Sequence, residues 1–241
     1  MSKVRYIEMR PQEFKEAIDR FPVAYLPLGT LEWHGPHMPL GADGIQSEAL
    51  FLKTAEKVGG VVLPMLYLGP DRYYHDSKME LYGMDLNMGG AIVEYPNQIL
   101  PGSAYWVNDE LFERILLATA ANLARQGIKY LVAHGHGPSI WAYLALKDRF
   151  YNDYGIKIVS LFDLVEDDKL KFQNDHAAAN ETAITMTVRP DLVDMSVLKS
   201  KEDMVAMAGA DPIEFASIEY GEALMEANVA ALSQWLLANV E

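Results

Sequence analysis

The sequence contains no cysteine. This absence excludes disulfide bonds, thiolate nucleophiles and zinc sites built from cysteine. Positive charge is also scarce, because 20 Lys and Arg residues stand against 34 Asp and Glu residues, for a net charge of −14. Nucleic acids and anionic membrane surfaces are bound through clustered Lys and Arg. The sequence therefore predicts neither kind of partner.

Long apolar runs are missing as well. No window approaches the roughly 18 consecutive apolar residues of a membrane span, and the first eight residues lack the apolar core of a signal peptide. No linker rich in Pro, Gly or Ser divides the chain, and half of its residues are hydrophobic. We therefore expect a cytoplasmic protein that folds as a single domain over residues 1–241.

Short apolar runs alternate with segments of helical periodicity along the chain. Strands are predicted at residues 23–28, 61–66, 129–133 and 156–162. Helices are predicted at residues 11–18, 46–58, 107–126, 140–151, 177–188 and 213–240. This alternation predicts an α/β fold with a mainly parallel sheet covered by helices on both faces. Residues 69–102 are the least regular region, which is typical of a functional segment or an oligomer contact.

The most informative segment follows the first predicted strand and places Glu32, His34, His37 and Asp43 within twelve residues. Open α/β sheets build their sites at the carboxyl ends of their strands. Glu32 and His34 are two positions apart on extended chain, so both can face one cavity, and Asp43 can reach back from the loop that follows. This set of ligand types predicts a divalent metal site for Zn, Mn or Fe. We expect His37 to fix the loop or to support a metal ligand.

Two further clusters have similar chemistry. His134 and His136 follow the strand predicted at 129–133, and the flanking glycines leave the rings unobstructed. One of these histidines can hold the tautomer of the other or contact the substrate. His176 lies just before a predicted helix and Glu181 within it, so that both can address the same cavity.

Together, the three clusters resemble the creatininase family of metal-dependent hydrolases. The first family motif, G-S/T-x-E-x-H-G-P-H-L-P-L-G-T-D, is nearly complete at residues 29–43. The second, N-G-H-G-G-N or a variant, aligns with residues 134–139. The third, H-A-G-x-x-E-T-S followed by P-D-L-V, aligns with residues 176–183 and 190–193. The resemblance is spaced along residues 23–193 and is most specific in the first motif.

The resemblance implies a site for two divalent ions per subunit, which could be Zn, Mn or Fe. Glu32 would bind one ion together with His136, His34 would bind the other, and Asp43 would bridge the two. The family also implies a compact α/β sandwich of creatininase type and assembly as a homo-oligomer, commonly a hexamer.

The sequence departs from the family pattern at three positions. Creatininase has a glutamate ligand two residues after the histidine of the second motif, where this chain has Pro138. Glu181 is the candidate to replace that ligand. His134 stands where the family usually has asparagine, and Ala179 stands where many members have an acidic residue. These departures argue against assigning creatinine as the substrate from the resemblance alone.

The predicted chemistry is hydrolysis by metal-bound hydroxide. Two ions bridged by Asp43 would lower the pKa of bound water, and the second ion would polarise the substrate carbonyl. His176 is our candidate for proton transfer to the leaving group. The expected substrate is a small polar molecule with a carbonyl-centred bond, such as a cyclic amide. Trp106 and Trp141 are core or interface anchors by default, and one of them could cap the site.

Three alternatives remain open at this stage. The same metals could open an oxidised cyclitol ring of the inosose type in carbohydrate catabolism, or they could cleave a formamide. A non-catalytic subunit that binds a metal or ligand is the third alternative. A binding subunit would leave its ligand unchanged, whereas a hydrolase would turn it over and lose activity with a chelator.

Overall fold

The computed structural model describes residues 3–87, 89–162 and 164–240. Within these ranges, four parallel strands form one sheet in the order β2-β1-β5-β6. The strands are β1 (Val23–Leu28), β2 (Val61–Val62), β5 (Tyr130–Gly135) and β6 (Lys157–Val159). All six residues of β1 and of β5 are buried. Such continuous burial is typical of a parallel sheet with both faces covered.

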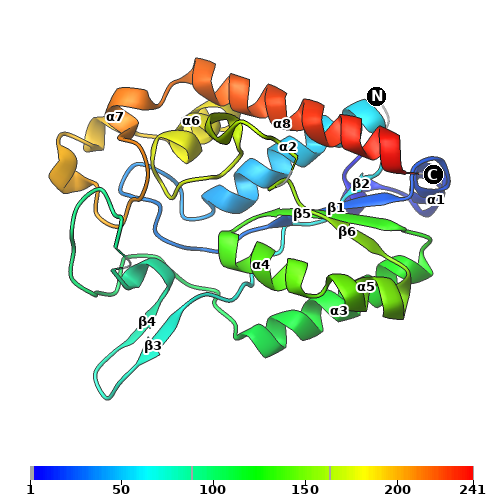
Figure 1. The fold of residues 1–241 in the computed structure, drawn as a ribbon, viewed down its shortest axis with the longest axis horizontal. Helices are drawn as coiled ribbons and strands as arrows, with labels where there is room; N and C mark the ends of the chain where they lie inside the picture. The colour runs from blue at the N-terminus through cyan, green and yellow to red at the C-terminus, as the bar shows by residue number, and fades with distance from the viewer. Residues whose placement is uncertain (1–2, 88, 163, 241) are drawn as a thin grey trace.

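Helices cover both faces of the sheet (Figure 1). One face packs against α1 (Pro11–Arg20), α3 (Asp109–Arg125), α4 (Gly137–Ala145) and α5 (Lys147–Tyr154). The other face packs against α2 (Ala42–Val58), α6 (Ala179–Val188) and α8 (Ile218–Asn239). Alternate residues of the strands fill the two cores, with Leu26 and Leu131 in the first and Tyr25 and Val132 in the second. The predicted fold class is confirmed.

The remaining elements are short. Figure 1 shows an antiparallel hairpin of β3 (Tyr73–His75) and β4 (Glu80–Tyr82) that projects from the body of the molecule. Helix α7 (Pro212–Phe215) precedes α8. The 3-10 helices are Tyr6–Glu8, Gly83–Asp85, Asp168–Leu170, Pro190–Leu192, Met195–Val197 and Lys201–Asp203. No helix in the described ranges is long and apolar enough to cross a membrane.

Several predicted boundaries were wrong. The helix predicted at 46–58 begins four residues earlier, at Ala42, so Asp43 lies in its first turn. The helix predicted at 140–151 is two helices that meet at Leu146. The segment predicted as one helix at 213–240 is also two, because Ser217 caps a new helix by accepting a hydrogen bond from the backbone N–H of Tyr220.

Candidate metal centre

The first two clusters meet because their strands are neighbours. Strands β1 and β5 pair along their full length and end together at Leu28 and Gly135. The backbone N–H of His136 then donates to the carbonyl of Leu28 at 3.0 Å. Gly135 has a φ of +138°, and a Cβ at this position would lie 1.7 Å from the Leu28 carbonyl oxygen. Only glycine therefore lets the His136 loop approach the end of β1.

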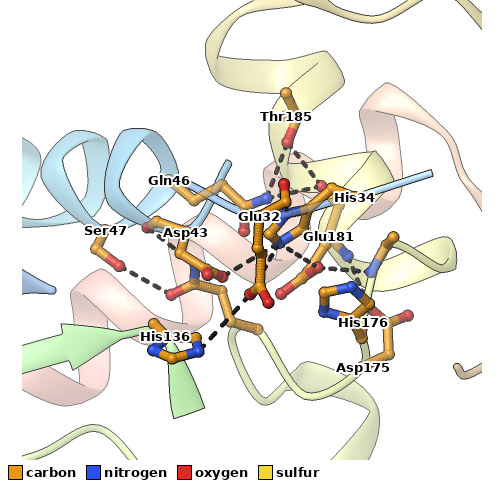
Figure 2. Close-up of polar contacts among 12 residues, drawn as sticks. Glu32, His34, Asp43, Gln46, Ser47, His136, Asp175, His176, Glu181 and Thr185 are labelled. Atoms are coloured by element: carbon orange, nitrogen blue, oxygen red, sulfur yellow. Dashed lines mark hydrogen bonds and ion pairs between the residues drawn. The ribbon is translucent and has the colours of Figure 1, made fainter. Parts of the chain in front are cut away.

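Asp43 of the first cluster and both residues of the third cluster come from the α2 side of the sheet. Asp43 lies in the first turn of α2 and Glu181 in the first turn of α6, whereas His176 lies just before α6. Figure 2 shows these side chains converging with Glu32 and His34. An acidic residue in the first helical turn is favoured by the helix dipole. This is a physical reason why Asp43 lies on a helix and not in the predicted loop.

His34 lies at the centre of a group of carboxylates. Its Nε2 atom is 3.5 Å from Asp43 Oδ1, 3.6 Å from Glu181 Oε2 and 4.0 Å from Glu32 Oε1. Its Nδ1 atom lies 3.2 Å from the backbone carbonyl of Glu32, to which Nδ1–H can donate. Nε2 makes no hydrogen bond within the described part of the chain. Ligands of one tetrahedral ion are roughly 3.4 Å apart for bonds of about 2.1 Å, so the group fits a metal ion.

His136 forms a second such group. Its Nε2 atom is 3.8 Å from Glu32 Oε1 and 3.1 Å from Asp71 Oδ2, and its Nδ1 atom is 2.8 Å from Ser139 Oγ. Asp71 was missed by the sequence analysis because it belongs to the irregular region 69–102. One signal could have found it. Asp71 is an acidic residue that follows a strand of the same sheet, as the other clusters do.

Three sets of ligand atoms lie within 4.8 Å of one another in the described residues, and each could hold a metal ion. The sets are Glu32, Asp71 and His136; His34, Asp43 and Glu181; and Glu32, His34 and His176. The structure thus brings together all six residues predicted as ligands or catalyst.

The centre holds an excess of buried carboxylates. Burial raises the pKa of Glu32 to about 8, against the opposing effect of His136 and His34. Burial likewise raises the pKa of Glu181 well above its ordinary value. Burial opposes the charge on His34, yet Asp43, Glu181 and Glu32 raise the pKa of that histidine to about 10. Without a metal ion, Glu32, Glu181 and His34 therefore retain their protons near neutral pH, and a metal cation could take the place of these protons.

His176 lies at the edge of this group. Its Nε2 atom is 2.8 Å from the carbonyl of Trp33, to which Nε2–H can donate, so Nδ1 carries the lone pair. Its ring centroid is 4.5 Å from that of His34. Burial and the neighbouring charge of His34 lower the pKa of His176 to about 3, so the ring is neutral. Such a ring can accept a proton.

A cavity of about 440 Å³ opens over the centre. Its walls include Glu32, Asp43, Asp71, His136, His176 and Glu181. Arg72, Lys171 and Asn174 add polar groups, and Trp141, whose exposed fraction is 65%, adds an aromatic face. A cavity of this size suits a small molecule.

Three other residues were predicted to contact substrate or to support the ligands. His37 Nε2 is hydrogen-bonded to the hydroxyl of Thr182 at 2.8 Å, which ties the first motif to α6. His134 Nε2 is 3.2 Å from the carbonyl of Phe172. The centroid of the Trp106 ring lies 5.8 Å from the centroid of the His136 ring. All three lie beside the centre, and their roles remain predictions.

Comparisons with known proteins agree with the architecture. The family model described as "Creatininase: Creatinine amidohydrolase" matches residues 7–236. Creatinine amidohydrolase from Pseudomonas putida is 27% identical over 192 residues. That match covers 72% of this chain and 66% of the relative, just under two thirds of the relative's length.

Solved structures of creatininase share the fold. A crystal structure of creatinine amidohydrolase has a TM-score of 0.73 at 22% identity, covering 98% of this chain and 97% of the other. A structure described as creatininase Mn has a TM-score of 0.70 at 21% identity, covering 97% of each chain. The chain belongs to the creatininase family of hydrolases.

Proposed function

We propose that this protein is a hydrolase that uses two divalent metal ions per subunit, Zn, Mn or Fe. The observation that carries the proposal is the buried Nε2 atom of His34. It makes no hydrogen bond within the described residues and faces three carboxylate oxygens at 3.5–4.0 Å. A metal cation that displaces the protons shared by these groups would be bound by the Nε2 lone pair and by the carboxylate oxygens together. Creatininase structures described as Zn–Zn type and as Mn support this choice of metals.

The donor set divides between two positions. Glu32 and His136 would hold one ion, His34 and Glu181 would hold the other, and Asp43 would lie between them. Glu181 is well placed to replace the carboxylate missing at Pro138. Its Oε2 atom accepts a hydrogen bond from the backbone N–H of Ala177 at 2.7 Å and lies 3.6 Å from His34 Nε2. The carboxylate is thereby fixed in the ligating direction.

Bound ions of this kind would supply an activated water and a Lewis acid for a carbonyl oxygen. The protein's own residues supply position and proton transfer. His176 lines the cavity, and the carbonyl of Trp33 fixes its ring with Nδ1 left free. We assign His176 a proton relay, in which its free Nδ1 accepts a proton from the attacking water and then donates that proton to the leaving group.

The substrate in this proposal is a small polar molecule with a carbonyl-centred bond, such as a cyclic amide. The name of the Pseudomonas putida relative, creatinine amidohydrolase, supports an amide. A second candidate is an oxidised cyclitol ring from carbohydrate catabolism. Arg72, Lys171 and Asn174 favour it, because these groups on the cavity wall can hydrogen-bond to ring hydroxyls. A formamide is a third carbonyl substrate for the same screen.

Metal analysis tests the proposal first. We expect about two equivalents of metal per chain in wild-type protein purified without chelator, and clearly less in His136→Ala. His75→Ala is the matched control, because His75 is an exposed histidine on the hairpin, and it should retain the wild-type metal content. Failure of the wild type to take up Zn²⁺ or Mn²⁺ would contradict the proposal.

Turnover is tested next, with lactams, formamides and inosose-like ketones as substrates. A chelator should abolish hydrolysis, and added Zn²⁺ or Mn²⁺ should restore it. Full metal loading without turnover of any of these classes would favour a non-catalytic binding subunit. The predicted homo-oligomer, a hexamer, is tested separately by light scattering, where a hexamer would have about six times the 27.0 kDa chain mass.

A further inference from the structure

Asp71 lies in the loop between β2 and β3, outside the three motif clusters. Only 4% of its side chain is exposed, and its Oδ2 atom is 3.1 Å from His136 Nε2. Its other oxygen, Oδ1, accepts a hydrogen bond from the backbone N–H of Arg72 at 2.6 Å. The carboxylate is thus fixed with one oxygen directed into the metal centre.

The tautomer of His136 bears on the role of Asp71. The Nδ1 atom of His136 is 2.8 Å from the Ser139 hydroxyl, which can accept its N–H. Nε2 then carries a lone pair opposite the carboxylates of Asp71 and Glu32, at 3.1 and 3.8 Å. Both separations are close to the roughly 3.4 Å expected between two ligands of one ion. A metal ion between these atoms would satisfy all three groups.

Glycines make room for this arrangement. Gly83 has a φ of +54°, and a Cβ there would lie 2.9 Å from Asp71 Oδ2. A Cβ on Gly69 would lie 2.2 Å from Ser139 Oγ. The backbone N–H of Gly83 donates to the carbonyl of Arg72 at 3.0 Å, which holds the Asp71 loop in place. These close contacts fix the position of the Asp71 carboxylate beside His136.

We propose that Asp71 is an additional metal ligand, on the ion held by Glu32 and His136. The inference rests on the proposed two-metal function. Glu181 replaces the carboxylate missing at Pro138 on the His34 ion, and Asp71 adds a carboxylate to the other ion, beside His136. With Glu32 and Asp43, the centre would contain four carboxylates, whose charge balances that of two divalent ions.

The test is Asp71→Asn, with Asp85→Asn as the matched control. Asp85 is a buried carboxylate of the same region whose hydrogen-bond donors are the backbone N–H groups of Tyr82 and Leu100. Metal stoichiometry and affinity are measured with Mn²⁺ and Zn²⁺ by competition with a chromogenic chelator. We expect Asp71→Asn to bind one ion with wild-type affinity and the other ion with an affinity lowered by more than about 100-fold. Asp85→Asn should hold both ions as the wild type does.

The size of the loss separates a ligand from a partner of a ligand. Removing a group that only hydrogen-bonds a metal ligand weakens binding by about 10–100-fold. A loss within or below that range would overturn the inference and leave Asp71 as a positioning residue for His136. If wild type and Asp71→Asn bind two ions with equal affinity, the two-metal function is supported and only the role of Asp71 as a ligand is contradicted. If the wild type binds none, the proposed function itself fails.

A second variant keeps the test decisive if Asp71→Asn does not fold. Asp71→Glu retains the carboxylate but moves it by one methylene. Direct ligation predicts that the visible d–d absorption of the Co²⁺-loaded protein differs between Asp71→Glu and wild type, because the coordination geometry changes. An unchanged spectrum at full loading would overturn the inference.

Discussion

His176 has one ring nitrogen committed to the Trp33 carbonyl and one left free beside the metal centre. Replacing it by alanine should lower kcat by about 10²–10⁴-fold, because the proton to the leaving group then has no positioned donor. KM and the two equivalents of metal should stay near wild-type values. Steady-state kinetics together with metal analysis check both expectations. Loss of an ion would instead make His176 a ligand, since it lies within one of the three potential metal-binding sets.

The residues of the site were predictable where their spacing is local. Glu32 and His34 are two positions apart, and the structure places their ligand atoms 4.0 Å from each other, as the extended-chain argument requires. Asp71 shares no periodicity or motif with them, and its carboxylate reaches His136 only through tertiary packing. Either Trp106 or Trp141 could cap the site according to the sequence. Trp141 lies in the cavity wall and the Trp106 ring lies beside the His136 ring, an arrangement that depends on tertiary packing.

The pairing of β1 and β5 determines where two of the clusters meet, and Gly135 is its most sensitive position. Gly135→Ala would place a Cβ 1.7 Å from the Leu28 carbonyl oxygen, at a positive φ. We expect loss of the folded protein or destabilisation by more than about 3 kcal/mol, since the backbone of β1 has to move. Chemical denaturation monitored by circular dichroism measures the effect.

The matched control for Gly135→Ala is Gly155→Ala. Gly155 also has a positive φ, +69°, but a Cβ there meets nothing within 4 Å. Gly155→Ala should lower the free energy of unfolding by only about 1 kcal/mol, because backbone strain is its only effect. Equal effects at the two positions would show that close approach to β1 is not what requires Gly135.

Strands could be predicted from the sequence where a run of apolar residues is buried in the sheet. The run at 23–28 is buried throughout and became β1 over the predicted residues. The run at 61–66 gave only Val61–Val62 as strand, although Leu66 still bridges to Leu28. The N–H of Leu63 still donates to the carbonyl of Tyr25, but the next bond to β1 runs from Leu66 to the carbonyl of Pro27, so the pairing is shifted by one residue and the regular ladder ends. The hairpin of β3 and β4 is exposed on β3, and no alternation of apolar residues marked it.

At the scale of the whole molecule, the buried titratable groups set how stability depends on pH. In the metal-free protein, the pKa of Glu32 is raised from 4.5 to about 8 and that of His34 from 6.5 to about 10. The folded state therefore binds more protons than the unfolded state, and these contributions to stability are lost as pH rises. Burial lowers the pKa values of His37 and His134 from 6.5 to about 4. Between about pH 4 and 6.5 the unfolded state binds more protons at these two residues, so their contribution to stability rises with pH.

These opposing effects predict a stability maximum of the metal-free protein near pH 6.5. Metal binding requires deprotonated ligands, so metal affinity rises with pH while the metal-free fold weakens. The difference in Tm between the Mn²⁺-loaded and chelator-treated protein should therefore widen from about pH 6.5 to 8.5, as thermal melts in matched buffers can measure. In His34→Gln, the decline of the metal-free protein above pH 6.5 should be shallower, because that variant lacks the imidazole whose pKa is raised most clearly by the carboxylates. A metal-free Tm that climbs steadily to pH 8.5 would mean that the carboxylates around His34 are not buried in the way the structure shows.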